Sequence, residues 1–569
     1  MNLHRNYPLY EVDPMNDFRS MIDRAADKYK DKPAVSYRRK PSEAEATRKT
    51  YVEVREDVVA LGTALCRMGC RGKKVAIIGE NSYGWVLSYL ATLSIGAVNI
   101  PVDKELPVAD MASILNTAEC GVILYGKIDG KIAEVSRLVP TLDTLIAFEA
   151  SEIEGAYTIP TLIEEGRAAY VAGDNSYYEA EINTEALASI VFTSGTTGKG
   201  KGVMLSQRNL CSNISQALHT MTVSDKTLFA LPMHHTYGST INLAGHLHVG
   251  SEFYISSGLK YILNELKQEQ PKHLVLVPLF VETFNKRIWS TAERQGKAKA
   301  LRMLIKVSNG MRKVKVDARR ILFSSILNQF GGKLHTIICG GAPLSSELVA
   351  TFDAFGITLL NGYGITECSP LISCNRNLYQ KDGSVGMPIL GEQIKIADPN
   401  EDGEGEICVK GPNVMQGYYN DPVATAAAFD EEGYFRTGDV GYQDEEGWIF
   451  ITGRSKNLII LSNGKNVYPE EIEMAISGVY GVDEVVVYAG ESKSNPDKEL
   501  IVAEIYPDHE ALKLRGIDDL TLYFEEEIRK INSRSVSYKT VSRIKLRTEP
   551  FPKNTTRKIT RFKIDKTID

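Results

Sequence analysis

The sequence has few of the residues that build metal centres and disulfide frameworks. Its eight cysteines are scattered over 569 residues without a CxxC pair, and its nine histidines form no cluster at metal-ligand spacing. We therefore expect reduced thiols in a cytoplasmic protein. The opening stretch MNLHRNYPLYEVDPMNDFRS lacks the apolar core of a signal peptide, which agrees with this expectation.

A strong excess of one charge is also missing. The formal net charge is −6, so the composition gives no reason to expect a nucleic-acid partner. Long apolar runs are scarce. The stretch that most resembles a membrane span is WVLSYLATLSIGAVNIPV, residues 85–102, which contains no charged residue. Its serines, glycine, asparagine and proline predict instead a buried helix, a glycine turn and a short parallel strand.

The length and the patterning indicate more than one domain. A chain of 569 residues predicts one large body and at least one smaller domain. Up to about residue 450, helical patterns alternate with short apolar runs such as KKVAIIGEN, HLVLVP and LHTIICGG, which predicts an α/β fold of βαβ units around largely parallel sheets. Short strands with glycine turns between 383 and 450 predict a small barrel or antiparallel lobe.

The last hundred or so residues predict a separate α+β unit. VDEVVVYAG and ELIVAEIYP are typical of strands, and LTLYFEEEIRKI of an amphipathic helix. The best candidate for the junction is TGRSKN, residues 452–457. We therefore expect a large domain over 1–454 and a small domain over 455–569.

Residues 285–320 carry a local excess of cations. The ordinary interpretation is a solvated helical surface; the alternative is a patch that contacts anionic lipid or the phosphates of a cofactor. Only Glu293 and Asp317 oppose the following cations: Lys286, Arg287, Arg294, Lys297, Lys299, Arg302, Lys306, Arg312, Lys313, Lys315, Arg319 and Arg320.

The loop TSGTTGKGKG, residues 193–202, follows the apolar run LASIVF. A Walker loop needs Ser or Thr directly after its lysine, but Gly202 and Val203 follow Lys201. The hydroxyls come first instead, and the glycines allow backbone amides to turn toward an anion. The loop alone predicts a phosphate-binding segment, with a plain surface loop as the alternative.

Further motifs follow in order: LPMHHTYG at 231–238, GGAPL at 340–344, NGYGITE at 361–367, YFRTGD at 434–439, GRSKNLIILSNGKNVYPEEIE at 453–473 and FPKNTTRKITR at 551–561. With FTSGTTGKGKGVMLS at 192–206 they resemble the adenylate-forming superfamily, which includes acyl-CoA synthetases, peptide-synthetase adenylation domains and luciferases. The resemblance implies a large domain of layered sheets with a β-barrel-like lobe, a small mobile C-terminal domain, and the use of ATP, Mg²⁺ and coenzyme A.

The resemblance also assigns roles to single residues. Lys558 matches the lysine that bridges the substrate carboxylate and the α-phosphate; a surface lysine in a basic tail is the alternative. Thr366 and Glu367 match the residues that bind the α-phosphate and magnesium. His235 matches the gate between the nucleotide and acyl pockets, with an ordinary buried histidine as the alternative.

The nucleotide is expected to contact a larger set. Tyr363 matches the aromatic that stacks on adenine, Asp439 the carboxylate that takes the ribose hydroxyls, and Arg454 its assistant. The alternatives are a core aromatic for Tyr363, a helix or turn cap for Asp439, and a solvated charge for Glu367. The remaining predicted ATP or AMP contacts are Thr193, Ser194, Gly195, Thr196, Thr197, Gly198, Lys201, Gly341, Ala342, Pro343 and Gly364.

Two further positions concern movement of the small domain. Lys456 matches the hinge about which that domain rotates after adenylation. Gly464 matches the residue that lines the passage for the pantetheine thiol, where a side chain would block it.

Departures from the pattern indicate a branch of the family. Gly200 stands where proline is usual, and Arg557 stands where glycine usually precedes the catalytic lysine. TTRKITR and NGKNVYPEEIE resemble bacterial long-chain fatty acyl-CoA synthetases. No extra segment around 330–460 resembles the insertion of relatives that load carrier proteins.

The sequence thus predicts an ATP-dependent long-chain fatty acid:CoA ligase in the cytoplasm. Alternatives are an acyl-AMP ligase that serves a carrier protein, a CoA ligase for medium-chain or aromatic acids, and a non-catalytic nucleotide- or acyl-binding protein. Contact of the 285–320 segment with the inner membrane face is a further hypothesis.

Overall fold

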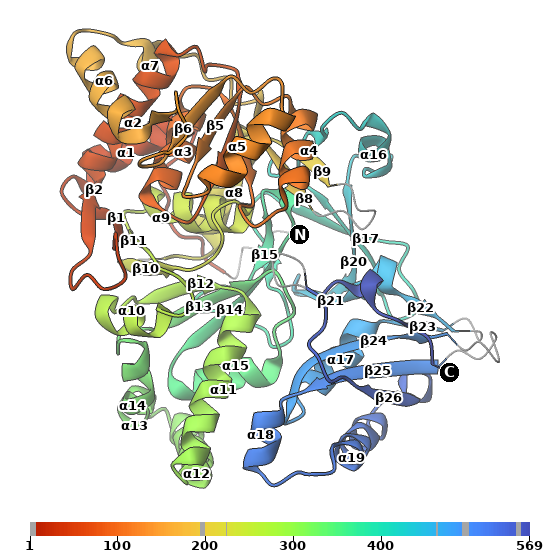
Figure 1. Cartoon of the computed structure of the whole chain (residues 1–569). Coiled ribbons are helices and arrows are strands. Elements are labelled where there is room, and N and C mark those ends of the chain that lie inside the picture. Colours follow the sequence, from red (N-terminus) through yellow and green to blue (C-terminus); the bar gives the residue numbers. More distant parts are fainter. Residues whose placement is uncertain are drawn as a thin grey trace.

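The computed structural model describes residues 7–193, 200–223, 225–461, 465–491, 500–553 and 559–568. These residues form an eight-stranded and a nine-stranded sheet, a four-stranded lobe, and a three-stranded sheet close to the C-terminus. In Figure 1 the eight-stranded sheet and its helices lie at the top, and the C-terminal unit lies at the lower right. The α/β class predicted from the patterning is confirmed.

The eight-stranded sheet has the order β19-β9-β8-β4-β3-β5-β6-β7. Its strands from β8 to β7 are parallel, while β9 folds back on β8 as an antiparallel hairpin. The strands are β3 (Lys74–Ile78), β4 (Val98–Val102), β5 (Val122–Tyr125), β6 (Thr144–Ala147), β7 (Tyr157–Thr158), β8 (Leu187–Thr193), β9 (Lys201–Ser206) and β19 (Gly417–Tyr418). The helices of this region are α1 (Phe18–Tyr29), α2 (Tyr51–Arg67), α3 (Tyr83–Ser94), α4 (Val108–Ala118), α5 (Asp129–Leu138), α6 (Ile159–Val171), α7 (Ser176–Glu179) and α8 (Gln207–Thr220).

The apolar stretch 85–102 folds as predicted. Helix α3 is buried from Trp85 to Ser94. Gly96 then takes φ +73°, a left-handed turn conformation that favours glycine, and the chain continues into the fully buried strand β4. Within the described ranges, every helix is too short or too polar to span a bilayer.

The nine-stranded sheet has the order β16-β15-β14-β13-β12-β10-β11-β1-β2. Its middle is parallel, and antiparallel pairs stand at both edges. The strands are β1 (Pro33–Tyr37), β2 (Thr47–Thr50), β10 (Lys226–Phe229), β11 (Glu252–Ile255), β12 (His273–Leu276), β13 (Thr336–Gly340), β14 (Thr358–Gly364), β15 (Leu371–Cys374) and β16 (Met387–Pro388). The helices are α9 (Gly245–His248), α10 (Ile262–Glu269), α11 (Pro278–Arg294), α12 (Ala298–Lys313), α13 (Arg319–Leu322), α14 (Ser324–Leu327) and α15 (Ser346–Phe355).

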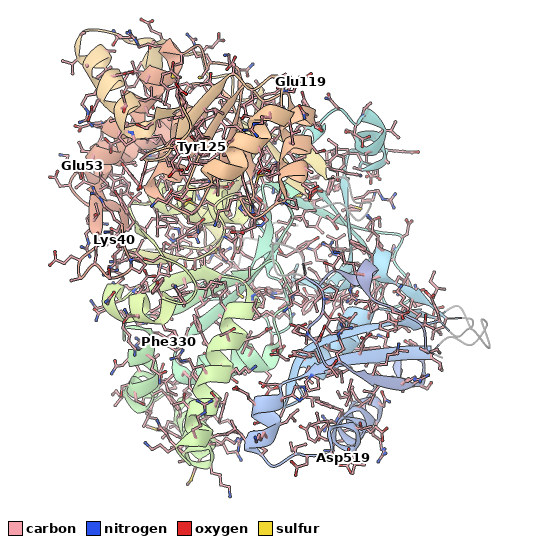
Figure 2. All side chains as sticks on the ribbon, viewed as in Figure 1. Lys40, Glu53, Glu119, Tyr125, Phe330 and Asp519 are labelled. Atoms are coloured by element: carbon pink, nitrogen blue, oxygen red, sulfur yellow. The ribbon has the colours of Figure 1, made fainter. Side chains whose placement is uncertain are left out.

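A separate apolar cluster packs beneath α11 and α12. Phe284 of α11 meets Phe330 with ring centroids 5.2 Å apart, and Figure 2 labels Phe330 in this region. Leu301, Leu304 and Ile305 of α12 pack against the same cluster. One face of α12 is therefore bound to the core, and the opposite face points outward.

The lobe is an open antiparallel sheet of order β17-β18-β20-β21. Its strands are β17 (Gln393–Ala397), β18 (Gly405–Lys410), β20 (Phe435–Gln443) and β21 (Ile449–Arg454), with α16 (Pro422–Ala427) nearby in the chain. Each pair of neighbouring strands in this sheet is antiparallel. Of the two forms that the sequence predicts, a barrel or an antiparallel lobe, the described residues adopt the second.

The C-terminal unit combines sheet and helices as predicted. Its elements are β22 (Ile459–Ile460), β23 (Asn466–Val467), α17 (Pro469–Ser477), β24 (Val482–Gly490), β25 (Leu500–Pro507), α18 (His509–Leu514), α19 (Leu520–Asn532) and β26 (Arg543–Leu546). Helix α19 begins after Asp519, labelled in Figure 2, whose carboxylate caps the backbone N–H of Leu522 at 3.0 Å. Phe524 and Ile528 of α19 are buried in the core of this unit.

All eight cysteines are free thiols, and seven of them are buried. Burial raises the pKa of these thiols, as for Cys70, whose pKa rises to about 11. The side chains therefore act as small apolar core residues, which agrees with the expectation of reduced thiols.

Candidate active site

A single cleft of about 4280 Å³ runs between the two large sheets, the lobe and the C-terminal unit. Segments far apart in the sequence contribute to its wall. The structure brings together, along this cleft, the predicted residues Thr193, Lys201, His235, Gly341, Ala342, Pro343, Tyr363, Gly364, Thr366, Glu367, Asp439, Arg454 and Lys456.

The predicted phosphate loop connects the two strands of a hairpin. Thr193 at the end of β8 pairs with Lys201 at the start of β9. The hydroxyl of Thr193 donates to the carbonyl of Lys201 at 3.4 Å, and the Lys201 ammonium lies 4.5 Å from the centroid of the Tyr418 ring. The predicted residues Ser194, Gly195, Thr196, Thr197 and Gly198 lie outside the described residues, so their role stays a prediction.

Glu367 is held by contacts from β19 and the segment before it. It lies in a short 3-10 helix, Thr366–Cys368, directly after β14. Its Oε1 accepts a hydrogen bond of 3.1 Å from the Tyr418 hydroxyl, and its backbone carbonyl accepts one of 2.8 Å from Met415. Burial raises the pKa of Tyr418, and the Glu367 carboxylate raises it further, so the phenol stays protonated and donates.

The turn before Glu367 depends on the absence of a side chain. A Cβ placed on Gly364 would lie 2.0 Å from the carbonyl oxygen of Pro370, so the chain crosses itself too closely for any other residue. The amide of Ile365 donates to that carbonyl at 2.8 Å. This crossing places Thr366 and Glu367 at the cleft wall.

Asp439 is a buried carboxylate of the site. Its side chain is 4% exposed, and its two oxygens are used by different partners. The Tyr363 hydroxyl donates to Oδ2 at 2.7 Å, and Nε of Arg454 lies 2.8 Å from Oδ1. Register explains the second contact, because Asp439 of β20 stands directly opposite Arg454 of β21.

The environment of this trio favours a neutral phenol on Tyr363. Burial raises the pKa of Tyr363 well above its ordinary value, and Asp439 adds to that rise. The expected assistance of Asp439 by Arg454 is thus present as a direct ion pair. Gly341, Ala342 and Pro343 follow β13 and are exposed toward the same cleft.

His235 precedes a buried π-helical segment, Tyr237–Ala244. Its backbone carbonyl accepts hydrogen bonds from the amides of Gly238 and Ser239, at 2.8 and 2.9 Å, and its ring lies 4.2 Å from that of His234. Burial lowers the pKa of His234, which favours the neutral imidazole despite Asp103 at 3.7 Å. The predicted gate residue thus lines the cleft within a hydrogen-bonded turn.

The junction to the C-terminal unit is also at the cleft. Lys456 lies in a 3-10 turn, Ser455–Asn457, directly after β21, and Asn457 donates to Oε1 of Glu470 at 2.6 Å. Gly464 and Lys558 lie outside the described residues. Lys553 and Ile559, the described residues that flank the segment with Lys558, form an antiparallel bridge and both line the cleft.

Tyr418 is a site residue that sequence reasoning missed. Its stretch GPNVMQGYY lies in the 383–450 region, whose pattern predicts only short strands and glycine turns, and its partner Glu367 is 51 positions away. Strand β19 pairs with β9, so Tyr418 connects the phosphate hairpin to the Glu367 turn. No local pattern in the sequence signals this contact.

The fold, the family model and the named relatives together identify an adenylate-forming acyl ligase. The chain belongs to the AMP-binding enzyme family, whose model matches residues 22–419. Enzymes of this family that ligate acids to CoA use ATP and CoA as substrates.

Named relatives are similar over most of the chain. "Long-chain-fatty-acid--CoA ligase FadD15" of Mycobacterium tuberculosis is 29% identical over 449 residues, which cover 74% of this chain and 72% of the relative. "Long-chain-fatty-acid--[acyl-carrier-protein] ligase AEE15, chloroplastic" of Arabidopsis thaliana is 28% identical over 537 residues, with 81% and 73% covered. The crystal structure of the anthranilate CoA ligase AuaEII with anthranoyl-AMP shares the fold, with a TM-score of 0.76, 19% identity, and 99% and 98% of the two chains covered.

Proposed function

We propose that this protein activates a long-chain fatty acid with ATP and transfers the acyl group to coenzyme A. The observation that carries the proposal is the single cleft, which gathers the phosphate hairpin, the Glu367 turn and the Tyr363–Asp439–Arg454 trio. The long-chain preference is supported by relatives that are named for long-chain fatty acids, together with the motifs TTRKITR and NGKNVYPEEIE.

The first half-reaction joins two anions. A carboxylate oxygen attacks the α-phosphorus of ATP, and the bond from that phosphorus to the leaving pyrophosphate breaks. Cationic side chains at fixed positions have to offset the repulsion between the carboxylate and ATP. This repulsion is worth about 4 kcal/mol for unit charges 4 Å apart in a partly desolvated site. We assign Lys201 to the phosphates and Lys558 to the carboxylate and α-phosphate; the position of Lys553 and Ile559 at the cleft supports the second assignment.

The nucleoside is assigned to the trio. Asp439 would accept hydrogen bonds from the ribose hydroxyls while Tyr363 and Arg454 fix its orientation. Tyr363 and the Gly341–Pro343 segment would flank the adenine. Tyr363, Asp439 and Arg454 are already bonded to one another, so little ordering of these side chains is needed when the nucleotide binds.

The chemistry of Glu367 and Thr366 fits a magnesium ion. Oε1 of Glu367 accepts from Tyr418, and among the described residues nothing donates to Oε2. In the described ranges no three His, Cys, Asp or Glu side chains gather into a metal site. A single carboxylate is nevertheless usual for Mg²⁺, which keeps waters and substrate phosphates as ligands and would neutralise phosphate charge here.

In the second half-reaction the thiol of CoA attacks the acyl carbonyl, and AMP leaves. We assign the two domains to residues 1–454 and 455–569, Lys456 to the hinge between them, and Gly464 to the thiol passage. The turn Ser455–Asn457 directly after β21 supports the hinge position. A carrier protein is the alternative acceptor, because one relative is named as a ligase for acyl carrier protein.

The decisive experiment is pyrophosphate release with ATP and magnesium across acids from acetate to oleate, with and without CoA. Turnover that peaks at long chains and requires CoA is expected. A burst of pyrophosphate that only a carrier protein converts into turnover would identify a carrier protein as the acceptor. A peak at medium-chain or aromatic acids would identify one of these acids as the substrate.

Lys558→Ala tests the assignment of the catalytic lysine. Adenylate formation should be lost, while thioester formation from preformed acyl-AMP should persist. Lys566→Ala removes an exposed lysine of the same tail and serves as the control. Equal loss of both half-reactions in Lys558→Ala would contradict the role.

A further inference from the structure

Helix α12 presents an outward face of unusual composition. At 3.6 residues per turn, Lys299, Lys306 and Lys313 are seven positions apart and form one edge of this face. Met303, Val307 and Val314 form the adjoining edge, and they are 68%, 48% and 72% exposed. We call these six residues the α12 surface.

The lysines of this surface carry uncompensated charge. Helix α12 contains no acidic residue. The neighbouring acids are paired elsewhere: Asp353 with Arg312 and Arg319, Asp317 with Arg319, and Glu293 with Arg515. Within the described residues, Lys299, Lys306 and Lys313 therefore form no ion pair. The basic segment 285–320 of the sequence thus contains a smaller patch, which consists of these three lysines on α12.

The location of the α12 surface separates it from substrate binding. None of its six residues lines the cleft, although the neighbouring Arg302 does. The surface therefore lies outside the cleft that is assigned to the substrates. In Figure 1 α12 lies at the lower end of the molecule, close to α11 and α13.

We propose that the α12 surface docks the protein on an anionic lipid bilayer. The lysines would contact lipid phosphates, while Met303, Val307 and Val314 enter the headgroup boundary. Long lysine stems allow both contacts at once, because the ammonium stays in the polar layer while the methylenes lie among apolar groups. An acidic protein would match the charge, but the strip of exposed apolar residues beside the lysines favours a partly apolar partner, as the surface of a bilayer is.

The test is co-flotation of the full-length protein with vesicles. Vesicles of phosphatidylglycerol and phosphatidylcholine in equal amounts are compared with phosphatidylcholine alone, at low and high salt. The wild-type protein should float with the anionic vesicles and be released by salt. The variant Lys299→Ala/Lys306→Ala/Lys313→Ala should partition at least about tenfold more weakly, since each lysine near an anionic surface contributes several-fold.

Two further variants separate the contributions. Met303→Ser/Val307→Ser keeps the charge and should still lower partitioning several-fold, which a purely electrostatic contact would not show. Lys30→Ala/Lys267→Ala/Lys566→Ala removes three exposed lysines elsewhere and should bind like wild type. Thermal unfolding of every variant confirms that the fold is intact.

Several results would overturn the proposal. The wild-type protein could fail to bind anionic vesicles. The Lys299→Ala/Lys306→Ala/Lys313→Ala variant could bind as strongly as the control with three lysines removed elsewhere. The Met303→Ser/Val307→Ser variant could bind as strongly as wild type. Binding of an acidic acyl carrier protein that is lost with the three lysines, without vesicle binding, would assign the surface to a protein partner. Flotation needs no substrate, so its failure is distinct from failure of the proposed ligase activity.

Discussion

The Tyr418 hydroxyl donates to Oε1 of Glu367 across 3.1 Å. The face of the same ring lies 4.5 Å from the Lys201 ammonium. One side chain thus contacts both the residue assigned to magnesium and the lysine assigned to the phosphates. Since β19 pairs with β9, Tyr418 links the phosphate hairpin to the Glu367 turn.

Tyr418→Phe should impair adenylation while keeping the ring beneath Lys201. A hydrogen bond to a charged group is worth about 1.5–3 kcal/mol, so kcat for pyrophosphate release should fall about tenfold or more. The magnesium concentration for half-maximal rate should also rise, because Glu367 loses the donor that orients it. Pyrophosphate release across a magnesium titration checks both effects.

Tyr419→Phe is the matched control for this variant. It removes a hydroxyl one position along, which bonds to Lys74 at 2.6 Å and does not line the cleft. It should leave the magnesium dependence unchanged. A similar shift in both variants would mean that Tyr418 acts on stability alone.

Asp439→Asn should weaken ATP binding more than it weakens the fold. Asparagine keeps the shape of the buried side chain and an oxygen that can accept from Tyr363, and the Arg454 that loses its partner is largely exposed, so the stability loss should be small. The KM for ATP should rise about tenfold or more, because a charge-assisted contact to the ribose is lost. Calorimetric ATP binding and thermal unfolding measure the two effects separately.

Two comparisons sharpen this prediction. Tyr363→Phe retains the carboxylate and loses only its 2.7 Å bond, so a smaller rise in KM is expected. Asp444→Asn breaks an ion pair with Lys381 outside the cleft and should leave ATP binding unaltered. Unchanged ATP affinity in Asp439→Asn would remove the ribose assignment.

Local patterns predicted the elements well and the contacts between them poorly. The stretch 85–102 and the two C-terminal strands follow from burial periodicity, which is a property of neighbouring residues. The Tyr418–Glu367 bond joins positions 51 apart, and the Lys286–Asp483 contact joins positions 197 apart. Such partners are set by sheet order, which no local window contains.

The candidate site has one part whose residues the structure describes and one part that lies outside the described residues. The motifs placed Asp439, Arg454, Tyr363 and Glu367 at one cleft, and the structure brings them together. The roles assigned to the 194–198 segment, Gly464 and Lys558 rest on resemblance and stay predictions. Charge counting found the basic segment but did not show which lysines lack an acidic neighbour, since that depends on Asp353 and other tertiary partners.

Helix α11 links the large body to the C-terminal unit through two opposite charges on one face. Nζ of Lys286 lies 3.1 Å from Asp483 and 2.6 Å from Asp508. Two turns further, Glu293 pairs with Arg515 at 2.8 Å. Lys286→Glu should loosen the C-terminal unit, because it places a third acid among two others.

Limited proteolysis at the 452–457 junction measures this loosening. Cleavage should accelerate severalfold in Lys286→Glu, and high salt should accelerate it in the wild type, since exposed pairs are screened. Adding Asp508→Lys should restore slow cleavage by exchanging the charges. Arg287→Glu alters an exposed neighbour without a recorded partner among the described residues and should have little effect. Cleavage that is insensitive to both charge and salt would show that α11 does not hold the unit.

Glu392 should make the protein less stable as the pH rises. The residue is 8% exposed, and neither carboxylate oxygen has a hydrogen-bond partner among the described residues. Burial raises its pKa from 4.5 to about 8. The folded state therefore binds a proton that the unfolded state has already lost between these two values, and about 1.4 kcal/mol of stability is lost per pH unit across that window.

Glu392→Gln replaces the protonated acid with a neutral side chain of the same shape, so it should remove this dependence. The free energy of unfolding of the variant should exceed that of the wild type by a few kcal/mol above pH 8, and the two should converge below about pH 5 as the wild-type carboxyl becomes protonated in both states. Glu431→Gln, at an exposed position, should follow the wild-type curve throughout. Chemical denaturation at a series of pH values checks the sign, and a variant that is less stable than wild type at pH 8 would mean that the ionised Glu392 has a stabilising partner.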